Sequence, residues 1–206
     1  MFFRILFITI YLLVLSSCSA SYKELSSGNY SSSDPFIKTI IKGYKDNADF
    51  EAKEMHDWDS AKLYSEKALK TYRGEKIQPE PIENWKIKED SLKELNKAYD
   101  NLMTVYNDGI INDPINLAEA IVALDCWAEQ QEEGWQFDHI KTCKSNFLTA
   151  IHLLYDNLAE NKTTTNENNS TIILTKKNDI IEKIIYFDFD GYKLNTKSID
   201  ELDIYF

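Results

Sequence analysis

Basic residues, histidine and cysteine are all scarce in this 206-residue chain, and each shortage excludes a class of function. Lys and Arg total 23 against 34 Asp and Glu, and the lysines are interleaved with acids, so the chain lacks the clustered positive charge that binds nucleic acid. The three histidines, His56, His139 and His152, have no mutual spacing suited to a metal, and no Cys-x-x-Cys pair occurs. The sequence therefore predicts no nucleic-acid partner and no metal site.

Catalytic and cofactor motifs are missing as well. The chain has only 6 glycines, and they form no Gly-rich phosphate loop. No credible Ser-His-Asp set can be assembled from the three histidines. We therefore expect a protein that is not an enzyme and that has no cofactor.

One apolar run stands out, between Ile5 and Leu15, and the single basic residue Arg4 precedes it. The run is roughly half the ~20 residues needed to cross a hydrocarbon core, so a permanent transmembrane helix is the weaker interpretation. A basic start, a short apolar stretch and small residues before a cut are typical of a secretory signal peptide. We expect residues 1–17 to be removed, which leaves 22 basic and 34 acidic residues and a formal charge of −12.

The end of this run, Leu15-Ser16-Ser17-Cys18, resembles the lipobox of bacterial lipoproteins. The resemblance implies that Cys18 carries a diacylglyceryl thioether and, on its new amine, an acyl chain such as palmitate. Two or more such chains anchor a protein stably to a membrane. Ser19 stands where an inner-membrane lipoprotein often has aspartate, so the resemblance implies the outer membrane, on its periplasmic face. The alternative is an ordinary cleaved signal with an incidental cysteine.

Besides Cys18, the only cysteines are Cys126 and Cys143, and an exported protein favours their pairing. If two antiparallel helices turn near Gly134, the two cysteines lie at similar distances on either side of the turn and face each other. A disulfide there would add about 3 kcal/mol by restricting the unfolded chain. The alternative is two reduced, buried cysteines that act as small hydrophobic residues.

The central part of the chain predicts a mainly α fold of antiparallel helical hairpins over residues 35–160. Residues 18–34 are rich in Ser, Gly and Asn without periodicity, and we expect a flexible tether there. Helix-start signals stand at Asp34-Pro35 and Asp113-Pro114, and Ser91 to Glu94 has capping-box spacing. Apolar residues repeat at helical spacing behind five such starts: Ile37, Ile40, Ile41, Tyr44, Ala48, Ala52 and Met55; Trp58, Ala61, Tyr64, Ala68, Leu69 and Tyr72; Leu95, Tyr99, Leu102 and Tyr106; Leu117, Ala118, Ile121, Leu124 and Ala128; Ile140, Cys143, Phe147, Ile151, Leu154 and Leu158.

Residues 57–61, with Ala68-Leu69 after them, resemble the second half of a tetratricopeptide unit, so we expect a hairpin that is partly of this type. No second copy follows at the expected period. Trp58, Trp85, Trp127 and Trp135 could line a ligand groove, but large aromatic residues dominate the burial in small helical bodies. We therefore expect the tryptophans to pack in the core.

Residues 161–178 begin with a polar, low-complexity stretch and are expected to be a linker. Beyond it, Tyr186-Phe187-Asp188-Phe189-Asp190, with Leu194 and Leu202-Asp203, resembles the opening strand and first helix of the OmpA-like peptidoglycan-binding domain. Residues 125–132, followed by Cys143, resemble the helical region that precedes this domain in alphaproteobacterial outer-membrane lipoproteins. We expect residues 179–206 to be the start of a truncated domain of this family.

The resemblance implies a structural role that ties the outer membrane to peptidoglycan. The family's aspartate and arginine that hold diaminopimelate have no counterparts here, so the chain is expected to have no peptidoglycan-binding residues, and binding is expected to be lost. One strand and one helix cannot fold alone, so residues 179–206 are expected to be poorly ordered or to need a partner. The alternative function is a helical module that binds another protein of the periplasm.

Two further interpretations of the same strand fail on their own motifs. Asp188 to Gly191 resembles the nucleophile loop of haloacid-dehalogenase-type phosphatases, in which the first aspartate attacks phosphorus. Tyr192 stands where Thr or Val is expected, and the downstream Lys and acidic ligands are missing. An EF-hand fails because Tyr192 occupies a ligand position and no glutamate closes the loop.

Overall fold

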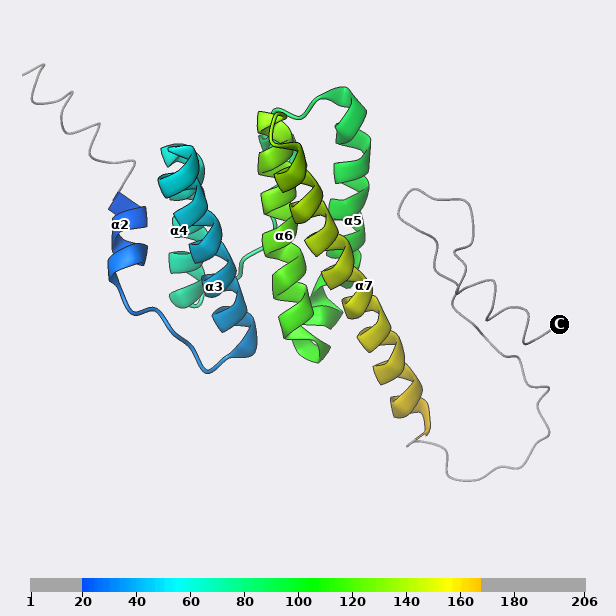
Figure 1. Cartoon of the computed structure of the whole chain (residues 1–206). Helices are drawn as coiled ribbons and strands as arrows, with labels where there is room; N and C mark the ends of the chain where they lie inside the picture. The colour runs from blue at the N-terminus through cyan, green and yellow to red at the C-terminus, as the bar shows by residue number, and fades with distance from the viewer. Residues whose placement is uncertain (1–19, 168–206) are drawn as a thin grey trace, which may run out of the picture. The chain divides into compact units, whose positions relative to one another are not determined.

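The computed structural model describes residues 20–167, with side chains through residue 160. The expected signal peptide, the lipidation site Cys18 and the OmpA-like segment 179–206 lie outside the described residues. Within them the protein is mainly helical and contains no strand. The elements in chain order are α2 (Ala20–Ser27), α3 (Pro35–Phe50), the π-helix η1 (Glu51–Met55), α4 (Trp58–Tyr72), the 3₁₀ helix η2 (Ile82–Asn84), α5 (Glu89–Asn112), α6 (Pro114–Glu133) and α7 (Phe137–Glu167) (Figure 1).

Aspartates start three of these helices, in two cases before a proline. Asp34 caps α3 and accepts a hydrogen bond from Ile37 N, and Asp113 caps α6 and accepts one from Asn116 N. A proline occupies the first turn of both helices. Asp57 caps α4 in the same way, through Asp59 N and Ser60 N. The predicted starts at Asp34-Pro35 and Asp113-Pro114 are therefore confirmed.

Three sequence-based expectations about the helices are wrong. The expected tether 18–34 contains helix α2, because Leu25 is fully buried and α2 packs against α4. Helix α5 begins at Glu89 without a side-chain cap, so the Ser91 capping box does not form, and the carboxylate of Glu94 instead pairs with Lys144 of α7. Helix α7 continues to Glu167, into the range 161–178 that was expected to be a linker.

Helix α6 is the centre of the body that ends at Ala159. It packs against α3 on one side and α5 on the other, while α3 packs against α4 (Figure 1). Its buried residues surround the helix instead of forming one stripe, as expected of a helix covered on several sides. Gly43 allows the close approach of α3, because a Cβ atom there would lie 2.8 Å from Cγ1 of Val122.

One buried polar network joins α6 to α3 and α4 through Asp125, which is fully buried. Its carboxylate accepts hydrogen bonds from the Tyr44 hydroxyl (2.7 Å), the Lys67 ammonium and the backbone N–H of Glu80 (2.7 Å). Its backbone carbonyl accepts a fourth bond from the Tyr64 hydroxyl. The four donors come from α3, from α4, which supplies two, and from the loop after α4. They satisfy both the carboxylate and the carbonyl of Asp125 and fix α6 against these neighbours.

Candidate functional site

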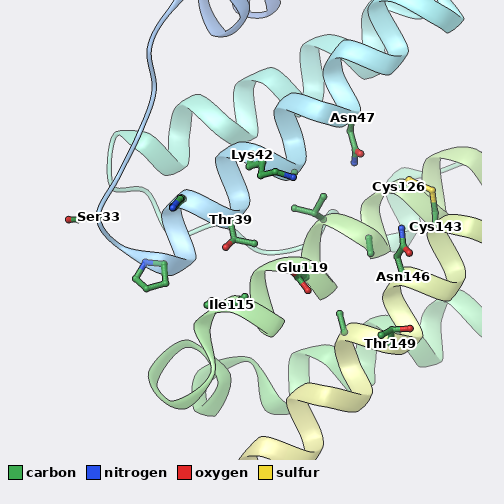
Figure 2. A pocket seen from close by; sticks show the side chains of 16 residues that line it. Ser33, Thr39, Lys42, Asn47, Ile115, Glu119, Cys126, Cys143, Asn146 and Thr149 are labelled. Carbon is green, nitrogen blue, oxygen red and sulfur yellow. A yellow bond between two sulfur atoms is a disulfide. The ribbon is translucent and has the colours of Figure 1, made fainter.

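A groove of about 770 Å³ runs between α3 on one side and α6 and α7 on the other (Figure 2). This volume lies within the range of small-molecule and peptide sites. Small and apolar groups line part of it, among them Gly43, Val122, Ala123 and Ala150, whereas Lys42 and Asn146 supply polar groups. The amide nitrogen of Asn47 also faces the groove, and it is buried without a hydrogen-bond partner among the described residues.

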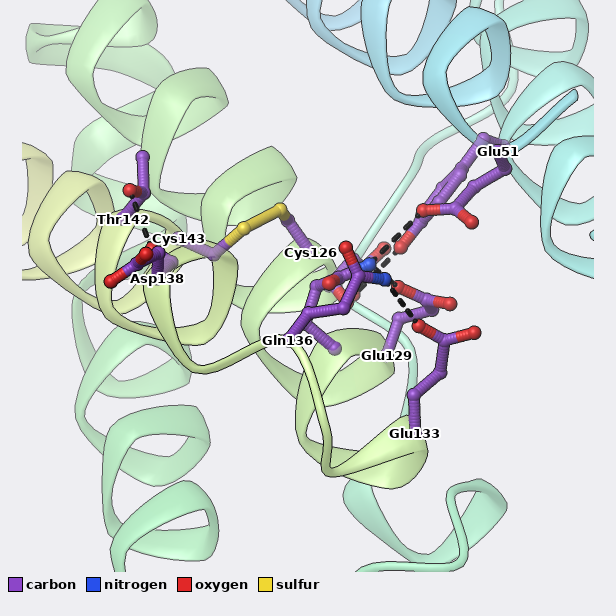
Figure 3. The surroundings of a disulfide bond; sticks show 11 residues. Glu51, Cys126, Glu129, Glu133, Gln136, Asp138, Thr142 and Cys143 are labelled. Atoms are coloured by element: carbon purple, nitrogen blue, oxygen red, sulfur yellow. Dashed lines mark hydrogen bonds between the residues drawn. A yellow bond between two sulfur atoms is a disulfide. The ribbon is translucent and has the colours of Figure 1, made fainter. Parts of the chain in front are cut away.

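The sulfur atoms of Cys126 and Cys143 lie 1.99 Å apart and line the end of this groove (Figures 2 and 3). The chain turns at Gly134, whose positive φ of 71° suits glycine at a helix end. The two cysteines therefore lie on facing surfaces of α6 and α7, as the sequence predicted. The covalent link holds together two of the three helices that form the groove.

A second site lies near the disulfide, where the carboxylates of Glu51 and Glu129 lie close together (Figure 3) and Asp57 joins them. One oxygen from each of Glu51, Asp57 and Glu129 lies within 4.8 Å of the other two. Glu51 and Glu129 are each only 2% exposed. The amide nitrogen of Gln130 donates to both, at 3.2 Å to Glu51 Oε1 and 2.6 Å to Glu129 Oε2.

The backbone between α3 and α4 brings Glu51 and Asp57 together. Glu51 opens the π-helix η1, and its carbonyl accepts a hydrogen bond from Asp57 N at 3.0 Å. His56, between them, has a φ of 57°, a left-handed conformation that is uncommon for residues other than glycine. π-helical turns are frequent at functional sites, and a left-handed residue is a common way to end a helix. This helix end brings the backbone of Asp57 back to Glu51.

Burial and mutual repulsion change the protonation of the two glutamates. Desolvation, followed by the negative charges of Glu129 and Glu133, raises the pKa of Glu51 to about 9. Desolvation also raises the pKa of Glu129 to about 7, although the hydrogen bond from Gln130 opposes this change. The two side chains therefore hold protons that exposed carboxylates would have lost near neutral pH.

The structure disperses the four tryptophans that the sequence placed in the core. Trp127 and Trp85 are buried, so the expectation holds for them. It is wrong for Trp58 and Trp135, which are 43% and 62% exposed. Trp58 is the first residue of α4 and contacts the ring of Tyr22 of α2 edge-on, and Trp135 lies in the turn between α6 and α7. None of the four lines the groove described above.

The histidines do not converge on a common site. His56 and His152 are exposed, and His139 packs its ring against Phe50, with 4.1 Å between the ring centres. His56 and His152 therefore lie on the surface, and His139 lies between α3 and α7. None of the three belongs to the carboxylate cluster.

Sequence reasoning missed both the groove and the carboxylate cluster. Glu51, Asp57 and Glu129 are up to 78 positions apart and belong to separate helical segments. The local signal was weak: Glu51 and Glu129 each stand next to a residue of an apolar stripe, Ala52 and Ala128, on the side of the helix that can face the core. No family model, curated protein or solved structure matches the chain.

In the part of the chain that the structure describes, no helix combines the length and the apolar content needed to span a membrane.

Proposed function

We propose that this protein is an exported, lipid-anchored protein of the cell envelope that is not an enzyme and that binds a segment of another envelope protein in the groove between α3, α6 and α7. The anchor would be Cys18, at the periplasmic face of the outer membrane. The groove is the observation that carries the binding function, since it combines a suitable volume with apolar and polar lining groups.

Three features support this proposal. The pairing of Cys126 with Cys143 fits an oxidising compartment, where disulfides persist. Helix α6 is fixed by the disulfide on one side and by the Asp125 network on the other, which makes the groove preformed. The amide nitrogen of Asn47 provides a buried donor that a backbone carbonyl of a bound segment can satisfy.

The resemblance to OmpA-family lipoproteins remains a separate proposal. It rests on residues 125–132 and Cys143 and on the strand motif at 186–190, and the strand motif lies outside the described residues. The resemblance to a tetratricopeptide hairpin rests on residues 57–61 and Ala68-Leu69. Both resemblances favour a structural or adaptor role in the envelope, which agrees with a protein-binding groove.

The test is site-specific photo-crosslinking in living cells with the full-length protein. A crosslinking side chain at Asn146, in the groove, is expected to capture one defined envelope protein, whereas the same group at the exposed Lys93 of α5 is the matched control. Filling the groove with Thr149→Phe, at an exposed position of its lining, is expected to abolish the product. Equal capture from both positions, or a product that survives Thr149→Phe, would contradict the proposal.

A further inference from the structure

The carboxylate cluster of Glu51, Asp57 and Glu129 is built on three separate elements. Glu51 opens η1, Asp57 caps α4, and Glu129 lies near the end of α6. One oxygen of each lies within 4.8 Å of the other two, and Figure 3 shows the side chains of Glu51 and Glu129 directed toward a common centre, with Glu133 nearby. Convergent acids at this distance repel one another, most strongly where burial excludes water.

The protein's own groups compensate only part of this charge. Oδ1 of Asp57 accepts from the first turn of α4, and Gln130 donates to one oxygen of each glutamate. The side chain of Ser60 also hydrogen-bonds to Glu129. Among the described residues, no Lys or Arg side chain forms an ion pair with any of the three acids. The charge of the cluster is therefore not balanced by a basic side chain.

An independent observation points to a missing partner. Oε2 of Glu51 is buried and has no hydrogen-bond partner among the described residues, although the side chain is 98% inaccessible to solvent. Oε1 of the fully buried Gln130 also has no hydrogen-bond partner among these residues. Buried oxygens without a donor are rare in folded proteins and call for an explanation such as an ion or a water. Oε1 of Gln130 can only accept a hydrogen bond, and Oε2 of Glu51 accepts one when its carboxyl group is ionised. In that state the partner that both oxygens lack is a donor or a cation.

We propose that Glu51, Asp57 and Glu129 bind a divalent cation of the hard, oxygen-preferring class, with Ca²⁺ as the ion that fits best. The ion would be held by one carboxylate from each of η1, the start of α4, and α6. It would thereby join the α3–α4 pair to the central helix.

The donor set and its dimensions favour Ca²⁺. The three groups offer only oxygen, whereas zinc sites in proteins use thiolate or imidazole ligands. Two ligands on opposite sides of Ca²⁺ are separated by about 4.6–5.2 Å, since its bonds to oxygen are about 2.3–2.6 Å long. The same separation around Mg²⁺ is only about 4.0–4.2 Å. The three oxygens lie no more than 4.8 Å apart, and the flexible shell of Ca²⁺ can take them without the near-ideal octahedral geometry that Mg²⁺ demands.

Further ligands are close to the site. Asp57 is half-buried, so water can approach the ion from its side. The amide of Gln130 directs its nitrogen at both glutamates, and a half-turn of that amide would present its oxygen there instead. Three carboxylates, one amide oxygen and solvent give the six to eight oxygens that Ca²⁺ prefers.

Tyr64 makes the binding directly observable. The hydroxyl of Tyr64 donates to the backbone carbonyl of Asp125, one helical turn before Glu129 in α6, which places the ring near the cluster. Tb³⁺ replaces Ca²⁺ at oxygen sites and emits light when a nearby tyrosine or tryptophan transfers energy to it. Excitation of the aromatic residues in the full chain, purified in detergent and stripped with a chelator, is expected to produce Tb³⁺ emission that Ca²⁺ displaces.

Matched variants locate the site. Glu129→Gln keeps the shape of the side chain and removes its charge, so we expect at least a tenfold loss of Tb³⁺ and Ca²⁺ affinity. Asp57→Asn is a second variant that preserves the helix cap and therefore the fold, and we expect the same direction of change. Glu54→Gln, an exposed position in the same π-helix η1, is the control and should bind as the unchanged protein does.

Thermal unfolding gives a readout that does not depend on luminescence. Ca²⁺ is expected to raise the Tm of the unchanged protein and of Glu54→Gln, but not that of Asp57→Asn, because the ion binds only the folded cluster. The absence of a Ca²⁺ response in the unchanged protein would overturn the proposal, and so would an equal response in all three proteins. A Mg²⁺ response as large as that of Ca²⁺ would overturn the assignment to Ca²⁺. None of these outcomes bears on the groove, so the proposed function is tested separately.

Discussion

At the scale of single residues, two buried carboxylate groups in this protein have opposite surroundings. Asp125 receives hydrogen bonds on both side-chain oxygens and has a lysine beside it. Glu51 is buried to a similar degree, but its neighbours are other acids and one of its oxygens has no partner among the described residues. Asp125 therefore stabilises the metal-free fold, whereas Glu51 costs stability unless a proton or a cation neutralises it.

Replacing Asp125 tests the first half of this contrast. Asp125→Ala leaves the Lys67 ammonium buried with only Glu80 near it, at 3.7 Å, and we expect a loss of about 3–5 kcal/mol in the free energy of unfolding. Urea unfolding followed by circular dichroism measures this change. Glu119→Ala, at an exposed position on the same helix, is the control, and a comparable loss in both variants would contradict the role assigned to the network.

The pH dependence of stability tests the second half, in protein freed of divalent cations by a chelator. Glu51 and Glu129 have an ordinary pKa of 4.5 in the unfolded chain and raised values of about 9 and about 7 in the fold, where Asp57 and Glu133 face them. Between pH 4.5 and 9 the folded protein therefore holds more protons than the unfolded chain, and its stability falls as the pH rises. The slope is at most about 1.4 kcal/mol per pH unit for each proton.

Glu51→Gln isolates this effect from the titration of the other acids. The variant has no charge at position 51, so the fall in unfolding free energy between pH 5.5 and 8.5 should be clearly smaller than in the unchanged protein. Glu54→Gln should leave the fall unchanged, because Glu54 is exposed. Parallel pH profiles for all three proteins would show that the cluster is not the source of the dependence.

At the scale of helices, local sequence signals located some boundaries and missed others. Asp34-Pro35 and Asp113-Pro114 were sufficient because an aspartate cap and a proline act on the first turn alone. The start of α5 was misplaced, since Glu94 has a stronger partner in Lys144, which only the tertiary fold brings near. Helix α2 was missed for the same reason, because its stability depends on the burial of Leu25 against α4.

Gly43 also shows how packing decides the effect of a residue. In an exposed helix Gly→Ala stabilises by about 0.5–1 kcal/mol, but a methyl group at Gly43 would lie 2.8 Å from Val122 Cγ1. We expect Gly43→Ala to destabilise the protein by about 1–3 kcal/mol. In a Val122→Ala background the same substitution should be neutral or stabilising, and a double-mutant cycle in urea measures the difference. Additive effects of the two substitutions would contradict a close contact between α3 and α6 at this point.

At the scale of the whole molecule, the helical class and the Cys126–Cys143 pair could be predicted, whereas the two candidate sites could not. Helical periodicity and a turn at Gly134 depend on residues near one another in sequence. The groove and the carboxylate cluster each need segments from both halves of the body, such as Asn47 with Asn146 or Glu51 with Glu129. Even the single stripe expected for α6 underestimated its burial, because neighbours on several sides were not foreseen.

Export and anchoring through Cys18 are the central claim about the whole molecule, and one measurement tests both. Intact-mass spectrometry of the protein extracted with detergent from cell membranes should show a chain that begins at Cys18, carries the mass of a diacylglyceryl group and an acyl chain, and lacks two hydrogens at Cys126 and Cys143. Cys18→Ser provides the control and should be released from membranes without detergent. A chain that retains residues 1–17 with an unmodified Cys18 and reduced thiols would contradict the claim.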